Sequence, residues 1–370
     1  MWAIFAPTTS LQQLPHNLVD WCCLALASYR QNNHVWRLVL AAIPILDDNP
    51  FARRLGIQYP ICQAGMYSVA YGSLAAAVSE AGGLGVIGSA FMSPDDLRRE
   101  INLVQRATDR PFGVDILFAE ARGTDDASAS YTEEVQAHIE VAFEECVPVI
   151  ISGLGNPGQI VGRAHESGML VMSLVGTSRQ ALSVQASGVD VVIASGHEGG
   201  GHVGRIGTLP LVCGVVDQVN IPVLAAGGVA DGRGLAAAFA LGAAGVWMGT
   251  RFIATEEARG HPNYKQKIVE IDEDGTVVSR ANSGKTARMI RNAFTEHWKA
   301  REGKIKPFPI QLREVGLAAS VAGRMEGDTE NGVLAAGQSA GVIHTIKPAG
   351  EVVADIIAEA RTTLIRMGAS

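Results

Sequence analysis

The feature that most constrains this chain is a regular alternation of short apolar runs and helical segments between Tyr59 and Met248. The runs are rich in β-branched residues and are mostly followed by glycine, which is typical of strands buried on both faces of a parallel sheet. Eight runs separated by single helical segments favour a (β/α)8 TIM barrel over a doubly wound sheet. The predicted strands are residues 59–66, 84–87, 111–117, 147–151, 169–174, 189–193, 221–225 and 245–248.

The segments between these runs have helical spacing and carry helix end signals. Ser93 is predicted to be an N-cap, with Pro94 in the first turn. In this fold the active site lies at the C-terminal ends of the strands, so the loops after strands one, six, seven and eight should meet at one mouth. The predicted helices are residues 70–81, 93–107, 132–145, 157–167, 177–187, 210–219 and 231–241.

Three segments flank the predicted barrel, which we expect to span residues 51–258. Residues 1–50 form an N-terminal extension of unknown role, which is either genuine or the result of an upstream start assigned in error. The apolar runs in this extension are well short of the roughly 20 residues that span a membrane. Residues 259–345 are charged and helix-prone, especially 286–299, and predict a helical cap. Residues 346–370 predict a C-terminal helix packed on the barrel, because apolar residues recur there at three and four positions.

The loop after the sixth predicted strand holds most of the candidate chemistry. Residues 194–205 contain five glycines, whose backbone can approach a flat or anionic ligand closely, together with His197, Glu198 and His202. Imidazole and carboxyl groups can move protons near neutral pH. This combination favours a ligand site with chemistry attached, although glycines also serve ordinary turns.

A second glycine cluster follows strands seven and eight, at residues 225–234 and 247–251. Loops at these two places in a barrel commonly bind phosphate, because exposed backbone N–H groups and a helix N-terminus favour an anion. Ordinary turn glycines are the alternative interpretation. The predicted phosphate-binding residues are Gly227, Gly228, Gly249 and Thr250.

The net charge and the cysteine content limit which binding partners and which cellular setting we expect for this chain. The formal net charge of −7, with no basic cluster evident along the chain, argues against nucleic-acid binding. The five cysteines form neither a CxxC pair nor an even disulfide framework, so we expect a reducing, cytoplasmic setting and no metal. We expect a small-molecule substrate and no membrane partner. A homodimer is possible on the sequence alone.

Four stretches resemble one family: residues 60–66, 198–204, 226–234 and 248–252, supported by 81–85 and 111–115. The family comprises FMN-dependent barrel enzymes that include nitronate monooxygenase (2-nitropropane dioxygenase), an NADH:quinone reductase and the FMN-type enoyl-ACP reductase. The likeness runs from about Phe51 to the C-terminus.

The resemblance implies non-covalent FMN and a set of residues around it. Asp115 stands where many members carry a flavin-binding asparagine, and an ionised carboxylate could not donate a hydrogen bond as that amide does. Asp115 either accepts from a flavin N–H or turns elsewhere, and its charge state stays open. His202 matches the family's active-site histidine. The residues implied to bind the cofactor are Ala64, Gly65, Met66, Asp115, Ser195, Gly201, Gly227, Gly228, Gly249 and Thr250.

The histidines have several interpretations. His202 can take the proton alpha to a nitro group or hold the substrate anion against the flavin. His197 is either a wall of the substrate site or a second proton-transfer group. We expect His138 and His165 to be solvated on helices, and Glu198 to orient its loop.

Three functions are compatible with the sequence. The first is an FMN-dependent nitronate monooxygenase that converts alkyl nitronates with O2 to carbonyl compounds and nitrite. The second is an NAD(P)H-dependent flavin reductase acting on quinones or enoyl thioesters. The third is a barrel that binds a phosphate-bearing ligand without turnover.

Overall fold

The computed structural model describes residues 43–118, 120–121 and 130–368, and contains an eight-stranded parallel sheet. The apolar runs noted within residues 1–42, and Cys22 and Cys23, lie outside the described residues. The barrel strands are β1 (Ile61–Gln63), β2 (Gly85–Gly88), β3 (Phe112–Leu117), β6 (Val149–Leu154), β7 (Leu170–Val175), β8 (Val191–Ser195), β10 (Val223–Ala226) and β11 (Gly245–Met248).

Backbone hydrogen bonds close this sheet into a barrel. Its strand order is β1-β11-β10-β8-β7-β6-β3-β2, and the two ends meet at a parallel bridge between Cys62 and Leu84. There the Gln63 amide donates to the Leu84 carbonyl, and the Leu84 amide to the Ile61 carbonyl, each over 2.9 Å. The predicted (β/α)8 barrel is therefore confirmed.

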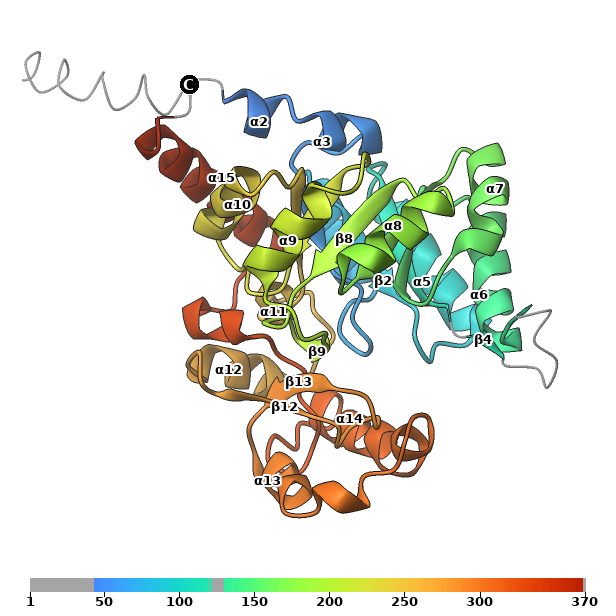
Figure 1. Ribbon diagram of the computed structural model, residues 1–370, viewed down its shortest axis with the longest axis vertical. Coiled ribbons are helices and arrows are strands. Elements are labelled where there is room, and N and C mark those ends of the chain that lie inside the picture. Colours follow the sequence, from blue (N-terminus) through green and yellow to red (C-terminus); the bar gives the residue numbers. More distant parts are fainter. Residues whose placement is uncertain (1–42, 119, 122–129, 369–370) are drawn as a thin grey trace, which may run out of the picture.

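Helices cover the outside of the barrel and both of its ends (Figure 1). The seven helices α4 to α10 fall within a few residues of the predicted ranges. Helix α5 begins after the predicted N-cap Ser93, whose Oγ accepts a hydrogen bond from the Asp96 amide. The helices are α2 (Pro44–Asp47), α3 (Pro50–Leu55), α4 (Gly72–Glu80), α5 (Pro94–Ala107), α6 (Glu133–Glu144), α7 (Gly158–Glu166), α8 (Ser178–Ala186), α9 (Thr208–Val216), α10 (Gly232–Ala240), α11 (Thr250–Ile253), α12 (Pro262–Glu270), α13 (Ala293–Lys299), α14 (Leu317–Arg324) and α15 (Ala349–Arg366).

Alternation along the strands divides the apolar core into two layers. Val86, Ile151 and Leu224 belong to the cluster inside the barrel, whereas their neighbours Ile87 and Ile150 pack against the helices. All of these side chains are fully buried. Because successive side chains of a strand point to opposite faces, the unbroken apolar runs in the sequence fill both layers.

The cap between residues 259 and 345 is not purely helical, so that part of the prediction was wrong. It contains β12 (Thr276–Ser279) and β13 (Ala287–Ile290), which pair antiparallel with each other. β13 also pairs with β9 (Gly201–His202), which lies in the glycine loop of the barrel. Pairing with a distant loop overrides the helix propensity of residues 286–290, leaving a helix only at α13.

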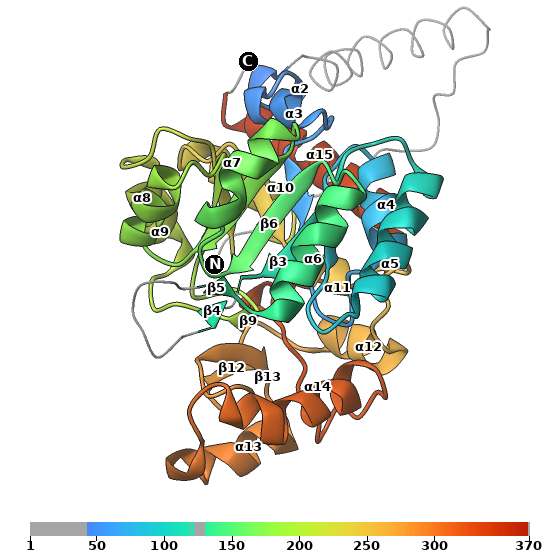
Figure 2. The ribbon, with the colours of Figure 1, turned by 90° about the vertical axis from the view of Figure 1, so that its right-hand side faces the viewer.

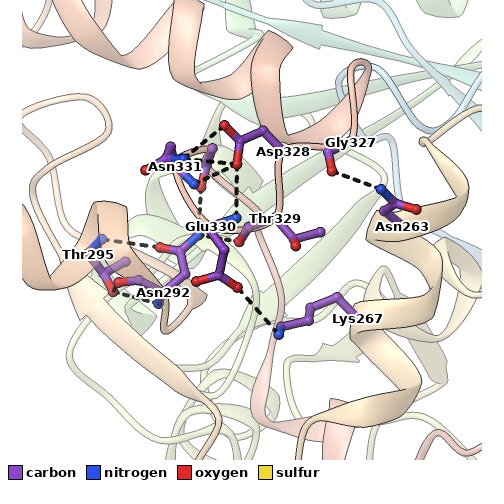
Figure 3. A network of polar contacts seen from close by, with 10 residues as sticks. Asn263, Lys267, Asn292, Thr295, Gly327, Asp328, Thr329, Glu330 and Asn331 are labelled. Atoms are coloured by element: carbon purple, nitrogen blue, oxygen red, sulfur yellow. Dashed lines mark hydrogen bonds and ion pairs between the residues drawn. The ribbon is translucent and has the colours of Figure 1, made fainter.

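A polar network holds the cap together around the turn that follows α14 (Figure 3). Asn263 of α12 donates to the Gly327 carbonyl over 3.1 Å, and Lys267 lies 3.8 Å from Glu330. Asn292, which caps α13, donates from Nδ2 to the Thr329 carbonyl over 2.8 Å. One turn thereby fixes the starts of two cap helices.

The end of the barrel opposite the cap is covered by α2 and α3, while α15 packs against α10 and α4 on the outer wall (Figures 1 and 2). Asn49 caps α3 and donates to the Ala244 carbonyl over 3.0 Å, while Arg361 of α15 donates to Asp47 of α2 over 2.9 Å. Ile43 and Leu46 are buried, so the folded body begins before Phe51. Within the part that the structure describes, no helix is long and apolar enough to cross a membrane.

The contact between α10 and α15 predicts a steric effect of one substitution. A Cβ at Gly232 would lie 2.2 Å from the Ala360 nitrogen and 2.4 Å from the Ile356 carbonyl oxygen. We expect Gly232→Ala to lower the free energy of unfolding by about 1–3 kcal/mol, because two packed helices would have to separate. Urea denaturation followed by circular dichroism measures this.

The matched control is Gly162→Ala on the outer face of α7, where a Cβ would meet nothing within 4 Å. There alanine should leave stability unchanged or raise it by up to about 1 kcal/mol, through its higher helix propensity. Equal effects of the two substitutions would contradict the packing argument.

Candidate active site

A cavity of about 770 Å³ lies between the C-terminal ends of the barrel strands and the cap. Its walls come from loops far apart in the chain, as the fold requires. Every residue implied to bind the cofactor lies on these walls together with His202, although their roles toward a cofactor stay predictions. They are Ala64, Gly65, Met66, Asp115, Ser195, Gly201, His202, Gly227, Gly228, Gly249 and Thr250.

One wall of the cavity is backbone that only glycine can form. Gly227 and Gly228 follow β10 with φ angles of 88° and 78°, in the left-handed region that other residues avoid. A Cβ at Gly227 would also come within 3.0 Å of the Gly196 carbonyl oxygen and the Gly199 nitrogen. A ligand in this part of the cavity would therefore meet main chain.

The glycine loop after β8 is held by its own glutamate. Glu198 Oε2 accepts hydrogen bonds of 2.8 Å from both the amide and the hydroxyl of Thr208. The Glu198 carbonyl oxygen accepts from the Gln338 amide over 3.0 Å. These contacts match the predicted role of Glu198 in orienting the loop.

Arg288 of β13 braces the same loop from the cap and was not anticipated from the sequence. Its buried guanidinium donates to the His197 carbonyl oxygen over 3.1 and 3.2 Å, and to Thr276 Oγ1 over 3.0 Å. No local pattern marks Arg288, because its partner stands 91 positions away and is reached only through the β9–β13 pairing.

His197 does not belong to the cavity wall. It is not among the described residues that line the cavity, and its Nδ1 lies 2.7 Å from the Gly204 carbonyl oxygen, to which it must donate. This placement favours neither of the two roles considered for it, and makes His197 a brace within its own loop.

His202 lines the cavity and has a partner in the cap. Its Nε2 lies 2.7 Å from Ser283 Oγ. The residue is exposed to the open cavity, yet the protein around it lowers the pKa of the imidazole to about 4, because desolvation disfavours the charged ring and the positive charges of Lys285 and Arg324 add to the effect. His202 is therefore a neutral imidazole at pH 7.

Asp115 is buried at the other side of the cavity, with Oδ1 lacking any hydrogen-bond partner. It fits a slot between two glycines, since a Cβ at Gly65 would lie 2.3 Å from the Asp115 Cβ and one at Gly153 would lie 2.5 Å from its Oδ1. Burial raises the pKa of Asp115 to about 8, against the opposing effect of a hydrogen bond from the Gly153 amide.

The cap contributes a wall that was not predicted from the sequence. Its apolar members have no periodicity, because they come from turns and short helical pieces, so no pattern could identify them. Together with Tyr67 and Phe91 they make this half of the cavity apolar, apart from two arginines. The cap residues are Phe308, Pro309, Leu312, Arg313, Leu317 and Arg324.

The prediction that His138 is solvated was wrong. The side chain is buried on the inner face of α6, where its Nε2 lies 2.9 Å from the Met92 carbonyl oxygen. His165 is partly exposed and lies 2.9 Å from Asp190 Oδ2. Nowhere in the described ranges do three His, Cys, Asp or Glu residues gather to hold a metal.

Known proteins share this architecture over almost the whole chain. The family model described as nitronate monooxygenase matches residues 49–359. A probable nitronate monooxygenase of Staphylococcus aureus is 34% identical, over 84% of this chain and 96% of its own length.

Two further relatives carry other names. A 5-hydroxy-7a-methyl-1-oxo-octahydro-1H-indene-4-carboxyl-CoA dehydrogenase of Mycobacterium tuberculosis is also 34% identical, over 85% of this chain and 96% of its own. The structure of FabK from Thermotoga maritima superimposes with a TM-score of 0.79 at 42% identity, covering 86% of this chain and 98% of that chain. The extent of these matches and the shared barrel architecture show that the chain is an oxidoreductase of the nitronate monooxygenase family.

Proposed function

We propose that this protein is an FMN-dependent nitronate monooxygenase that oxidises alkyl nitronates with O2 to carbonyl compounds and nitrite. The observation that carries the proposal is the neutral imidazole of His202 on the cavity wall, with the cations Lys285 and Arg324 close enough to lower its pKa. A nitronate is an anion, and such a site attracts an anion while offering it a neutral hydrogen-bonding group.

The cavity fits a planar cofactor that bears a phosphate. Its volume of about 770 Å³ lies within the usual range for ligand pockets. The glycine backbone at Gly227, Gly228 and Gly249 would hold the phosphate, and Gly65 and Met66 would face the ring. Bound FMN would supply the electron transfer, while the protein positions the substrate and keeps out water.

His202 suits the holding of an anion better than the removal of a carbon-bound proton. A base with a pKa of about 4 is weak toward a nitroalkane, whose proton needs a base that titrates closer to neutral pH. The Ser283 hydroxyl fixes the orientation of the ring. We therefore expect preformed nitronates to be better substrates than neutral nitroalkanes.

Replacement of His202 tests the proposal. His202→Ala should lower kcat/KM for nitrite release from propionate-3-nitronate by about 10²–10⁴-fold, because the substrate anion loses its hydrogen-bonding partner. His165→Ala, on the outer helix α7, is the matched histidine control and should leave the rate within about twofold. A flavin-loaded wild type that releases no nitrite would refute the function.

A reductase that takes large anionic substrates is the second candidate, and the charge of the cap favours it. The expectation that the chain has no basic cluster was wrong here: residues 280–324 hold ten Lys and Arg against three Asp and Glu, a formal charge of +7 within a chain of −7. Arg313 lies exposed on the cavity wall beside the apolar half. The relative named for a carboxyl-CoA substrate acts on a molecule that combines an apolar group with phosphates.

Anaerobic stopped-flow separates the two candidates. The monooxygenase predicts that flavin absorbance changes promptly with a nitronate and stays constant with NADH or NADPH, and the reductase predicts bleaching by a pyridine nucleotide. Under the second outcome, Arg313→Glu should raise KM for an enoyl-CoA about five- to tenfold at low salt. Arg106→Glu on α5, outside the cavity, should leave KM unchanged.

The cellular setting is also a proposal. Cys62, Cys146 and Cys213 are free thiols among the described residues, which supports a reducing cytoplasmic environment. Reaction of the freshly isolated protein with a thiol reagent under denaturing conditions tests this, and a count below five thiols would contradict it.

A further inference from the structure

The carboxyl group of Asp115 has an environment that ordinarily excludes a carboxylate. Its side chain is buried, and Oδ1 has no hydrogen-bond partner. Asp190, the other deeply buried aspartate of the barrel, shows the usual solution: it accepts from Arg54, from His165 and from the Val171 amide. A buried charge without such partners is strongly disfavoured.

The elements packed around Asp115 offer it no charge. Neighbouring β2 and β6 place Gly88 and Gly153 beside it, and the loop after β1 places Gly65 against its Cβ. The ionisable residues that also line the cavity are Glu134, His138, His202, Arg313 and Arg324, and none of them contributes to the titration of Asp115. Only burial and the Gly153 amide do.

The glycines around Asp115 and the neighbouring cavity determine where its carboxyl group can meet a ligand. A Cβ at Gly65 or at Gly153 would collide with Asp115, so glycine at both positions is what leaves room for its carboxyl group. Gly65, Asp115 and Gly153 all line the cavity, while Oδ1 itself is enclosed beside Gly153, so a turn of the carboxyl group about χ2 presents both of its oxygens to a ligand. An unsatisfied group in such a place is prepared for a ligand.

We propose that Asp115 is a neutral carboxylic acid in this protein and that it pairs its O–H and its C=O with a planar amide-like edge of the bound cofactor. A protonated carboxyl group presents one donor and one acceptor side by side, as a carboxamide does. The inference rests on the proposed function for the identity of the cofactor as FMN, whose ring carries such an edge.

The proposal makes cofactor binding depend on pH. Ionisation of Asp115 removes the donor and places a negative charge against an electron-rich carbonyl oxygen, so FMN should bind less tightly once the carboxyl group is ionised. The pKa of about 8 sets the range of pH in which this happens. An asparagine at this position would keep both hydrogen bonds at every pH.

The first test uses the protein without cofactor and compares Asp115→Asn with the wild type. An aspartate whose pKa is higher in the folded than in the unfolded state costs stability as pH rises from about 4 to about 8. The Tm difference in favour of Asp115→Asn should therefore grow between pH 5.5 and pH 8 and then level off. A difference that does not change with pH would overturn the proposal.

Asp190→Asn is the matched control, because it removes a buried carboxylate that has a cationic partner in Arg54. It should lower Tm at neutral pH, opposite in sign to Asp115→Asn. Should Asp115→Asn fail to fold, infrared spectra of wild-type protein with 13C-labelled aspartate give the same information. A protonated-carboxyl band at pH 6 that vanishes by pH 9 is expected, and its absence at pH 6 would refute the neutral acid.

The second test titrates FMN into the apoprotein by fluorescence quenching from pH 6 to pH 10. The wild-type Kd should rise by up to tenfold per pH unit above about pH 8, and the Kd of Asp115→Asn should lack this rise. A rise of the same size in both proteins would overturn the pairing. Failure of the wild type to bind FMN at any pH would instead refute the proposed function, and leave the stability result to decide the state of Asp115.

Discussion

The short antiparallel pairing of Gly201–His202 with Ala287–Arg288 is the contact on which the site depends. It joins a glycine loop of the barrel to a sheet of the cap, and so brings His202 within 2.7 Å of Ser283. The same pairing carries Arg288 to the His197 carbonyl oxygen. Without this pairing, the cap would not be held over the C-terminal end of the barrel.

Most of the barrel and its glycine loops could be predicted because their signals are local. A strand buried on both faces gives a continuous apolar run, and a positive φ leaves few residues besides glycine at positions such as Gly227. The cap could not be predicted in this way, because partners far away in the chain set its structure. β13 forms where propensity favours a helix, since β9 and β12 pair with both of its edges. Arg288 and His138 look like ordinary surface residues until the folded chain places a carbonyl group beside each of them.

The two ionisable groups that matter most in the cavity are both shifted toward neutrality, from opposite directions. Burial lowers the pKa of His202 and raises that of Asp115, so the cavity holds an uncharged base and an uncharged acid. The cap supplies the positive charges of Lys285 and Arg324 near His202, and neither side chain forms an ion pair within the part of the chain that the structure describes. A ligand entering the cavity is the natural source of the missing negative charge.

The chain order of this assembly has a consequence for how the protein is made. The barrel strands are complete by Met248, but the partner strand of His202 begins at Ala287 and the helix that packs on α10 begins only at Ala349. On a ribosome the core of the barrel can assemble while the cap end and the outer wall between α10 and α4 are still unfinished. The enzyme would therefore become a closed body late in synthesis, and these two surfaces are the ones that a nascent chain leaves exposed longest.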